Sequence, residues 1–436
     1  MTAEKPREIA IRILERWERG AHFIEDILRE VDQIRIAPAD RRLIQELTYG
    51  VVRWRATLDW LIAGKTDDRR QNPIVRLLLR VGLYQAFWLD RIPDHAVVNE
   101  TVEMAKRLGF EAKAGFVNAV LRSCLREQAL IQQALEDLKS SQPALGHSHP
   151  KWLYDRWRGR WGAEKASQLM KWNNTPSQTY ARVNTLRGDH RQLLELWRGE
   201  GVACELFRRD WLEENLVFEL KAPVALANLP SFRQGLFYIQ DPSTLLAVAE
   251  LNPQPGEHIL DLCAAPGGKT TFIAQKMQNQ GRIIANDTQA DRLVLLQQNC
   301  ARLGVTCVDI EPSTLDLRPS TLCDHIIVDA PCSNTGVMRR RVDLRWRIRP
   351  EEIERLRQTQ IELLRIAAER LKPGGSLVYS TCSLEPEENG AVVRQFLAKH
   401  PEFNLDRERE LLPFVDEVDG AYVARICRPV KPQHRD

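Results

Sequence analysis

The chain has 436 residues, a formal net charge of +3, 43% hydrophobic residues and 28% charged residues. A chain of this length can bury two or three separate cores, so we expect a multidomain globular protein. The net charge is close to balanced and gives only a weak indication of a nucleic-acid partner, so local charged patches must carry that argument.

The N-terminal segment predicts neither a signal peptide nor a membrane anchor. Ile9, Ile13 and Trp17 share one face of a helix that charged residues interrupt. The most apolar segment, residues 74–89, contains Arg80 and other polar side chains, which predicts a buried helix within a bundle. We therefore expect no membrane-spanning segment.

The nine cysteines are scattered along the chain without a C-x-x-C pair or a neighbouring histidine cluster. This spacing argues against a zinc site and against a disulfide framework. Free cysteines are typical of a reducing compartment, so we expect a cytoplasmic protein without a bound metal.

Periodicity along the chain predicts three domains. Residues 1–140 show helical spacing and almost no strand pattern, which indicates an all-α domain. Residues 141–150 gather Ser, Pro, Gly and His and are expected to form a linker. Residues 151–235 predict a small α+β lead-in domain. Residues 236–436 alternate strand, loop and helix, which predicts an α/β Rossmann-like domain with a mainly parallel sheet.

The expected parallel strands end in polar side chains. "HILDL", "GRIIAND", "HIIVDAP" and "GGSLVYSTC" are the strand candidates, and Asp261, Asp287, Asp329 and Cys382 fall at or just past their ends. Ligands of such sheets bind beyond the carboxyl ends of the strands, so one cleft is expected to collect these residues.

The stretch "LDLCAAPGGKT" ends like a phosphate-binding loop, but that motif needs a glycine five places before Gly268, where this chain has Cys263. Its small residues instead suit a nucleoside ligand, and Asp287, 26 residues after Asp261, suits ribose hydroxyls. The loop therefore favours an adenosyl cofactor over a nucleoside triphosphate, and an ATPase remains the alternative.

Cys332 and Cys382 each lie among Pro, Ser, Thr and Asp at a strand end, where we expect exposure and thiolate formation. The other cysteines outside the glycine-rich loop are expected to be small buried apolar residues: Cys124, Cys204, Cys300, Cys307, Cys323 and Cys427. A thiolate that adds to carbon 6 of a cytosine makes carbon 5 nucleophilic, and a second thiol could assist collapse of the adduct. Asp329 would hold ring nitrogen 3 or the amino edge, and the base would have to be unstacked.

The blocks "LDLCAAPGGKT", "DAPCSNTGVMRR" and "YSTCSLEPEEN" resemble the signature blocks of the RNA cytosine-5 methyltransferases of the NOL1/NOP2/Sun type. "YARVNTL" and "QDPST" resemble the stretches before them. "RRLIQELTYGVVRWRATLDWLI", "LRVGLYQAFWLDRIPDHAVVNETVEMAK" and "GFVNAVLR" resemble the helical NusB-like domain. Together they cover nearly the whole chain and resemble the bacterial enzymes that methylate a cytosine of 16S rRNA.

The resemblance implies that Cys382 is the nucleophile and that Cys332 aids release of the methylated product. It implies S-adenosylmethionine as the cofactor, bound by Cys263, Ala264, Ala265, Pro266, Gly267, Gly268, Lys269, Asp287 and Asp329. Arg292 is a further cofactor candidate, with a solvated helix face as the alternative interpretation.

The chain departs from the family pattern in two places. The usual Gly-Asp pair after the third strand is replaced by "DIEPSTLDL", so Ser313, Thr314 or Asp316 must contact the adenine, and we name Asp316 as the candidate. Val342 stands where proline is common.

Six arginines and Trp346 lie between residues 339 and 349. A solvated helix face is one interpretation, and RNA binding by Arg339, Arg340, Arg341 and Trp346 is the other. The expected partner is 16S rRNA, free or in an early small-subunit assembly intermediate, with the protein a monomer. A tRNA cytosine-5 methyltransferase and a NusB-like RNA-binding factor without catalysis remain the alternatives.

Overall fold

The computed structural model describes residues 5–20, 22–32, 36–66, 71–222, 224–312 and 322–430. The chain divides into two compact units, Met1–Thr175 with Met338–Arg347, and Pro176–Val337 with Ile348–Asp436. Across the described ranges, no helix combines the length and the apolar character that crossing a membrane requires.

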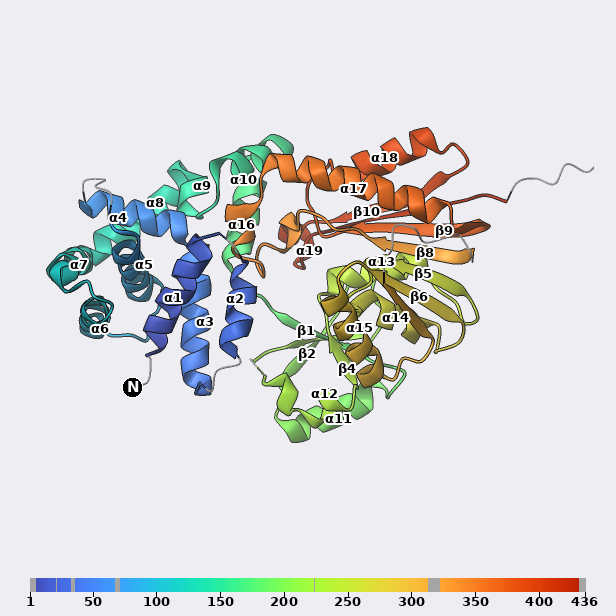
Figure 1. Cartoon of the computed structure of the whole chain (residues 1–436), viewed down its shortest axis with the longest axis horizontal. Helices are drawn as coiled ribbons and strands as arrows, with labels where there is room; N and C mark the ends of the chain where they lie inside the picture. The colour runs from blue at the N-terminus through green and yellow to red at the C-terminus, as the bar shows by residue number, and fades with distance from the viewer. Residues whose placement is uncertain are drawn as a thin grey trace, which may run out of the picture. The chain divides into compact units, whose positions relative to one another are not determined.

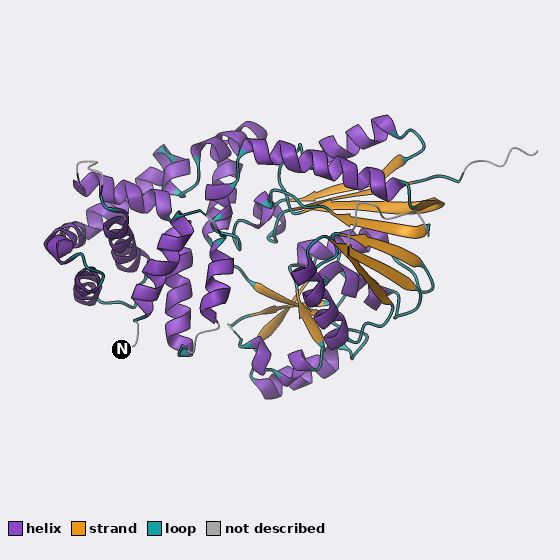
Figure 2. Ribbon diagram, in the orientation of Figure 1, coloured by secondary structure: helices purple, strands orange, loops and turns teal. Residues whose placement is uncertain are grey.

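The first unit is helical, and within the described residues it contains no strand (Figures 1 and 2). Its helices are α1 (Pro6–Glu18), α2 (Ile24–Asp32), α3 (Pro38–Arg53), α4 (Arg55–Thr66), α5 (Pro73–Trp88), α6 (Asp94–Arg107), α7 (Glu111–Arg126), α8 (Gln128–Ser141), α9 (Pro143–Gly146), α10 (Lys151–Asn174) and α16 (Leu344–Arg347). The all-α prediction for the N-terminal region is therefore confirmed.

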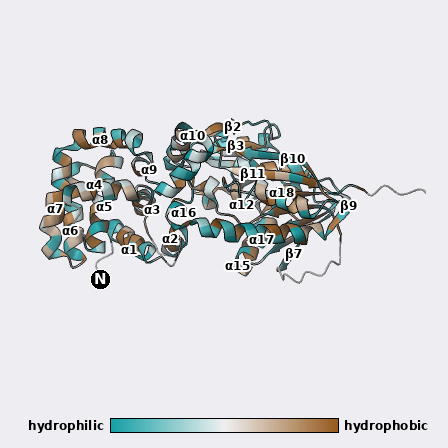
Figure 3. Cartoon of the chain, turned by 90° about the horizontal axis from the view of Figure 1, so that it is seen from above, coloured by the Kyte–Doolittle hydropathy of each residue, from teal (hydrophilic) through white to brown (hydrophobic). Residues whose placement is uncertain are grey.

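Helix α5 forms the centre of the helical unit and contacts α1, α3, α4, α6 and α7. It begins at Pro73, and the side chain of Asn72 caps it by accepting a hydrogen bond from the Ile74 amide at 2.9 Å. Brown and teal alternate along the surrounding helices, as expected of amphipathic packing (Figure 3).

The buried arginine of α5 is neutralised within the helical unit. Arg80 has both a bidentate contact to Asp59, with two distances of 2.7 Å, and a contact to Glu18 at 2.5 Å. A buried charge is tolerated only when it is paired. The prediction of a buried bundle helix at residues 74–89 is thus confirmed.

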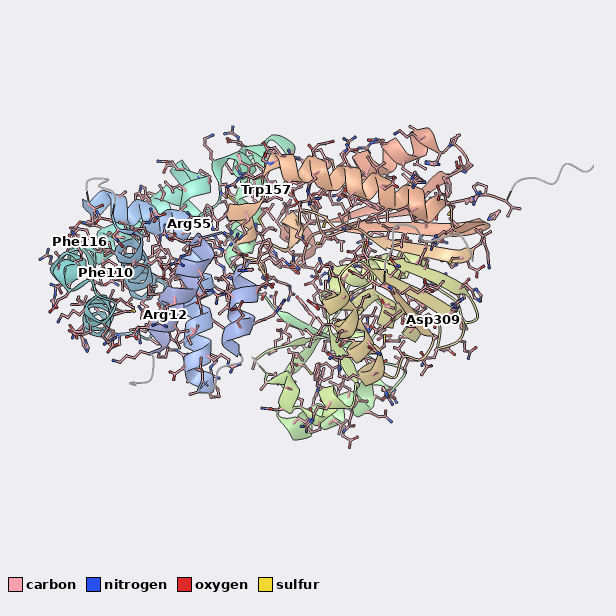
Figure 4. The ribbon with its side chains drawn as sticks, viewed as in Figure 1. Arg12, Arg55, Phe110, Phe116, Trp157 and Asp309 are labelled. Atoms are coloured by element: carbon pink, nitrogen blue, oxygen red, sulfur yellow. The ribbon has the colours of Figure 1, made fainter. Side chains whose placement is uncertain are left out.

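The expected linker is instead packed into the helical unit. His147, Ser148 and His149 are buried, and the Ser148 hydroxyl accepts a hydrogen bond from the Ala56 amide at 3.0 Å. The ring of His149 packs edge to face on Trp157, the buried residue labelled on α10 in Figure 4. The Ser, Pro and Gly content therefore marks a tight turn around α9 and not an exposed connection.

The second unit contains two sheets (Figure 2). The smaller has the order β2-β3-β1-β4, and its three strand pairs are antiparallel. Its strands are β1 (Thr179–Val183), β2 (Cys204–Phe207), β3 (Val217–Leu220) and β4 (Phe237–Ile239), joined through α11 (His190–Glu200), η1 (Leu226–Asn228) and α12 (Pro230–Arg233). This sheet and its helices form an α+β region, as predicted, but not with the predicted bounds of 151–235: α10 belongs to the helical unit, and β4 extends the sheet to Ile239.

The larger sheet has the order β10-β11-β9-β8-β5-β6-β7. Its strands are β5 (His258–Leu262), β6 (Arg282–Asp287), β7 (Val308–Pro312), β8 (Cys323–Asp329), β9 (Leu371–Thr381), β10 (Asn404–Leu411) and β11 (Ala421–Cys427). Five strands are parallel, and β11 pairs antiparallel with both β9 and β10. The mainly parallel sheet is confirmed.

Helices cover both faces of the larger sheet (Figure 1). They are α13 (Leu246–Leu251), α14 (Gly268–Lys276), α15 (Ala290–Leu303), α17 (Pro350–Ala368) and α18 (Gly390–Lys399), with η2 (Pro242–Leu245), η3 (Thr335–Val337) and α19 (Pro413–Asp416) in the connections. Ile259 packs with the side chains of α13, α14 and α15, whereas Leu260 packs with those of α17 and α18. Adjacent residues of a strand point to opposite faces, so β5 is buried on both sides from Ile259 to Leu262, with Asp261 as its buried polar residue.

Candidate active site

The strand register brings the predicted site residues to one edge of the larger sheet. Leu262 at the end of β5 is paired with Asn286 of β6 and with Val328 of β8, and Asp329 is paired with Ser380 of β9. The loops that follow β5, β6, β8 and β9 therefore start side by side. The order of the sheet reverses between β5 and β8, which is where such sheets bind ligands.

The loop after β5 uses its backbone amides within the domain. The amide of Ala264 donates to the Asn286 carbonyl at 2.9 Å, that of Ala265 to the Asp287 carboxylate at 3.2 Å, and that of Gly267 to the Ala264 carbonyl at 2.9 Å. A phosphate-binding loop needs such amides free to surround the anion. The geometry thus disfavours the ATPase alternative.

Gly267 is required where the loop meets α14. Its φ of 101° lies in the left-handed region, and a Cβ there would stand 2.5 Å from Cδ1 of Leu296. Next to it, a Cβ on Gly268 would stand 3.1 Å from Nε2 of Gln240. The small residues of this loop therefore allow close packing of α14 and α15 against the end of β5.

A pocket of about 250 Å³ lies beside this loop. Its lining includes Tyr238, Ile239, Gln240, Asp241, Thr244, Asp261, Cys263, Ala264, Ala265, Pro266, Gly268, Lys269 and Asp329. Three of these are aspartates, an environment that suits a ligand carrying a sulfonium, an amine and ribose hydroxyls. Of the predicted cofactor residues between 263 and 269, only Gly267 is not in the lining.

Asp261 provides a direct test of whether this pocket fits such a ligand. Its Oδ2 accepts a hydrogen bond from Thr270 at 2.7 Å, but its buried Oδ1 has no protein partner. Burial raises the pKa of Asp261 to about 7. An unpaired buried acceptor is unfavourable in the free protein and is satisfied by a ligand that donates a hydrogen bond. The pocket therefore fits the adenosyl cofactor that the sequence predicts.

Asp287 lies just behind this lining and organises the loop. It is buried and accepts hydrogen bonds from the amides of Ala265 at 3.2 Å and Gln289 at 3.1 Å. Arg292 on α15 lies 3.6 Å from the same carboxylate and also donates to the Ala265 carbonyl. Arg292 thus bridges Asp287 to the loop. Asp316, Ser313 and Thr314 lie outside the described residues.

Lys269 and Asp329 form an ion pair in the pocket, with Nζ 2.7 Å from Oδ2. Burial alone would lower the pKa of Lys269, but the charge of Asp329 and its hydrogen bond outweigh burial and raise it. The lysine is therefore an ammonium ion at neutral pH. Ser380 donates to the other oxygen of Asp329 at 3.0 Å and fixes the carboxylate.

The two predicted cysteines, Cys332 and Cys382, lie close together just after strands β8 and β9. The sulfur atoms of Cys332 and Cys382 are 3.4 Å apart, although 50 residues separate them in the chain. Cys382 donates a hydrogen bond to Oδ1 of Asn334 at 2.9 Å. Asn334 has a φ of 57°, a left-handed conformation that asparagine tolerates. Its side-chain Nδ2 donates a hydrogen bond to the Cys332 carbonyl at 2.7 Å.

The expectation that Cys332 is exposed was wrong. Cys332 is buried, with 8% of its surface accessible, because Ser333 and Thr335 after it are drawn into the interior. The hydrogen bond with Cys382, burial, and the charges of Cys382 and Glu388 raise the pKa of Cys332 well above its usual range. Cys332 is therefore a neutral thiol, whereas Cys382 is partly exposed and is the cysteine that a substrate can reach.

Cys263 lies in the cofactor loop but is not a third nucleophile. Burial, followed by the charges of Asp329 and Asp287, raises its pKa to about 12. A thiol of such pKa is protonated at neutral pH. Among the described residues, no group of three or more His, Cys, Asp and Glu side chains could hold a metal ion.

The arginine segment after Cys332 packs within the helical unit. Arg339 is buried, with its guanidinium 4.2 Å from the ring centre of Trp172, and Trp346 donates to the Val52 carbonyl at 2.8 Å. Arg340 is half-buried, and Arg341 is exposed. Of the four residues predicted to bind RNA, Arg339 and Trp346 therefore have structural roles, because distant helices supply partners that the local sequence does not reveal.

Two residues near the site were missed from the sequence. Arg182 on β1 is buried and donates to the Gly268 carbonyl at 2.8 Å and to Gln240 at 2.7 Å, and burial lowers its pKa to about 9. An arginine inside an apolar strand was a signal available in "YARVNTL". Glu388 is fully buried below the two cysteines, but nothing distinguishes it within "LEPEEN".

Three family models match the chain. Residues 248–427 match the 16S rRNA methyltransferase RsmB/F family, residues 4–126 match the NusB family, and residues 149–225 match the ferredoxin-like domain of RsmF/B-like methyltransferases. The ferredoxin-like match contains β1, β2 and β3 of the smaller sheet.

Curated relatives match over almost the full length. The ribosomal RNA small subunit methyltransferase B of Vibrio vulnificus is 36% identical over 97% of this chain and 99% of its own, and that of Klebsiella pneumoniae is 34% identical over 97% and 98%.

Solved structures resemble the chain as well. The protein PH0851 has a TM-score of 0.78 and 25% identity over 98% of this chain and 99% of its own. A methyltransferase homologue from Pyrococcus horikoshii has a TM-score of 0.58 and 33% identity over 66% of this chain and 97% of its own. With its NusB region, its ferredoxin-like region and its RsmB/F methyltransferase region, the chain belongs to the ribosomal RNA small subunit methyltransferase B family.

Proposed function

We propose that this protein methylates carbon 5 of a cytosine in 16S rRNA through a covalent bond between Cys382 and carbon 6 of the base. The observation that supports this most directly is the 3.4 Å separation of the Cys332 and Cys382 sulfur atoms beside the pocket that Asp329 lines. Methylation alone needs no cysteine pair. Carbon 5 of cytosine, however, becomes nucleophilic only after addition at carbon 6.

The methyl donor is S-adenosylmethionine, which, when bound, supplies an electrophilic methyl group for carbon 5. Asp261, with its unpaired Oδ1, and the loop that contains Gly268 would hold it in the 250 Å³ pocket. Arg182 holds that loop from behind through the Gly268 carbonyl. Lys269 holds the side chain of Asp329 in place through the ion pair at 2.7 Å.

The residues of the site have separate roles in this proposal. Cys382 donates a hydrogen bond to Oδ1 of Asn334 in the resting state and, once deprotonated, adds to carbon 6 of the base. Asp329 holds the ring nitrogen 3 or amino edge and so orients the base beside Cys382. After a base removes the proton from carbon 5, the bond between Cys382 and carbon 6 breaks. Cys332, a neutral thiol 3.4 Å away, donates a hydrogen bond to the departing sulfur.

The choice of 16S rRNA rests on the relatives, which are named for the ribosomal RNA of the small subunit. We expect the protein to act as a monomer, on free 16S rRNA or on an early assembly intermediate. The cytosine must leave its stack to reach Cys382, so single-stranded or loosely paired RNA is the favoured substrate. A tRNA substrate remains the enzymatic alternative.

Arg341 is the remaining candidate for RNA contact in the arginine segment, since it is exposed. The double replacement Arg340→Ala/Arg341→Ala is expected to weaken RNA binding and to lower the slope of affinity against salt, because each phosphate contact releases counterions. An unchanged slope would exclude this segment from the RNA interface.

The deciding experiment measures transfer of labelled methyl groups from S-adenosylmethionine to protein-free 16S rRNA, followed by nucleoside analysis. Cys382→Ala is expected to lose 5-methylcytosine, and Cys332→Ala to accumulate a protein–RNA adduct. Cys427→Ala, which removes a partly exposed cysteine of β11, serves as the control. Label in tRNA alone would overturn the substrate, and methylation by Cys382→Ala at the normal rate would overturn the mechanism.

A further inference from the structure

Glu388 is a buried carboxylate that accepts four hydrogen bonds. Oε1 accepts from the Ser333 amide at 2.8 Å and from Nε2 of Gln360 at 3.1 Å, while Oε2 accepts from the hydroxyls of Ser333 and Ser383, the latter at 2.5 Å. These four donors are neutral groups. Burial raises the pKa of Glu388, and a buried carboxyl group is costly, so its retention here indicates a use beyond packing.

The partners of Glu388 directly follow the two cysteines of the site. Ser333 is the residue after Cys332, and Ser383 is the residue after Cys382. The two serine hydroxyls are 3.0 Å apart, so one carboxylate joins the ends of two loops that belong to different strands. Each cysteine is thus next to a serine that Glu388 holds, and we call this set of hydrogen bonds the junction. The junction therefore constrains the distance between the two sulfur atoms.

Further contacts hold the junction rigid. The Tyr379 hydroxyl donates to the Glu388 carbonyl at 2.6 Å, which fixes the backbone that carries the carboxylate. Thr335 accepts a hydrogen bond from the Leu384 amide at 2.9 Å and so ties the same two loops a second time. Positional precision of this kind requires such a supporting layer of hydrogen bonds.

We propose that Glu388 is a positioning residue for the cysteine pair: its carboxylate joins Ser333 to Ser383 and so keeps the sulfur atoms of Cys332 and Cys382 close enough to act on the same base. Its catalytic importance rests on the function proposed above, whereas its effect on the distance between the sulfur atoms does not. The charge of Glu388 adds to this role, because together with Cys382 and burial it raises the pKa of Cys332. Tyr379 is a further titratable side chain that interacts with Cys332.

The distance between the thiols can be measured without RNA or cofactor. Phenylarsine oxide forms two As–S bonds with a pair of close thiols and releases one molecule of water, so no oxidant or reductant is consumed. We compare its affinity for each variant with its affinity for Cys332→Ala, which has lost one of the two thiols. The difference reports whether both sulfur atoms can bind the same arsenic atom. In Glu388→Ala we expect this affinity to fall at least about tenfold, as the loss of a buried hydrogen-bond junction implies.

Two further variants separate positioning from general damage. Glu388→Gln keeps groups that can hydrogen-bond to Ser333 and Ser383, so its affinity for the arsenical is expected to stay within about threefold of the wild type. Glu387→Gln changes the neighbouring, half-buried glutamate and is the matched control. In steady state, Glu388→Ala is expected to lower kcat without raising KM for RNA, because the base-binding residues are unchanged.

The outcomes distinguish this inference from the function on which it rests. Wild-type affinity for the arsenical in a folded Glu388→Ala would overturn the positioning role even if 5-methylcytosine is formed normally. The expected loss of affinity in a protein that forms no 5-methylcytosine would keep the positioning role and overturn the proposed reaction. If Glu388→Ala does not fold, Ser333→Ala/Ser383→Ala gives the answer, since unchanged arsenical affinity in that variant would refute the junction.

Discussion

Asp343 is predicted to be one of the most sensitive positions in the helical unit, although it lies far along the chain from the helices it contacts. Its carboxylate is buried, and a single oxygen accepts hydrogen bonds from Nε1 of Trp17 at 3.1 Å and from the Ile24 amide at 2.9 Å. Arg347 lies 3.3 Å from the same oxygen. The carboxylate therefore connects α16 and the segment before it to α1 and α2.

The expected loss of stability follows from these partners. Asp343→Ala leaves the Trp17 and Ile24 donors buried without an acceptor, at a cost of about 1–3 kcal/mol each, so we expect about 2–6 kcal/mol in total. Asp343→Asn retains an amide oxygen that both donors can use and loses only the charge, so a smaller cost of about 1–2 kcal/mol is expected. The order of the two variants is as important as the magnitudes.

Hydrogen exchange of the Ile24 amide is the assay, because this amide donates directly to Asp343. A loss of 3 kcal/mol corresponds to about a hundredfold faster exchange when the helical unit opens reversibly. Asp309→Ala is the control: Asp309, labelled in Figure 4, is exposed and pairs with Arg282 in the other unit. Unchanged exchange in Asp343→Ala, or a larger effect in Asp343→Asn than in Asp343→Ala, would refute this account.

Three further predictions concern the cofactor loop. Because burial raises the pKa of Asp261 to about 7, the folded state keeps a proton between roughly pH 4 and pH 7 that the unfolded state has lost, and stability falls as pH rises through this window. Asp261→Asn should therefore show a smaller loss than the wild type in urea titrations, and parallel curves would contradict the burial argument. Gly267→Ala, which forces a Cβ against Leu296 at a φ of 101°, should cost about 1–3 kcal/mol and abolish the thermal shift caused by S-adenosylmethionine; a normal shift would count against the loop as the cofactor site. Lys269→Met leaves Asp329 without its cation and should lower methyl transfer at least about tenfold, with partial recovery in Lys269→Arg; full activity in the methionine variant would show that the ion pair is dispensable.

The sheet was predicted where its strands are apolar. β5, β6, β8 and β9 are buried on both faces, and continuous apolar runs of this kind are visible in the sequence. β10 was not predicted, because its sequence "NLDREREL" is largely charged and exposed. It is a strand only because β11 provides hydrogen-bond partners along one edge. Edge strands of this type depend on a neighbour that local periodicity does not reveal.

The sequence predicted which candidate residues lie close together, but not how deeply they are buried. Asp329, Cys332 and Cys382 were correctly predicted to lie close together, because they are at or just past the ends of parallel strands that end at one edge of the sheet. The burial of Cys332 was missed because Glu388, 56 residues later, draws Ser333 inward. A buried carboxylate and an exposed one look alike in a sequence, so the supporting layer of a site is harder to predict than its reactive groups.

The connection between Cys332 and α17 explains why the arginine segment has its composition. The chain leaves the second unit after Val337, contributes Met338–Arg347 to the helical unit and then returns to the second unit. Within the helical unit Arg345 is fully buried and donates to Asn174 at 2.8 Å. A chain that lacks residues 1–175 would leave Asp343 and Arg345, which lie 11 and 13 residues after Cys332, without these partners. The helical unit is thus required for the chain that follows Cys332 to be packed, whatever it also contributes to binding RNA.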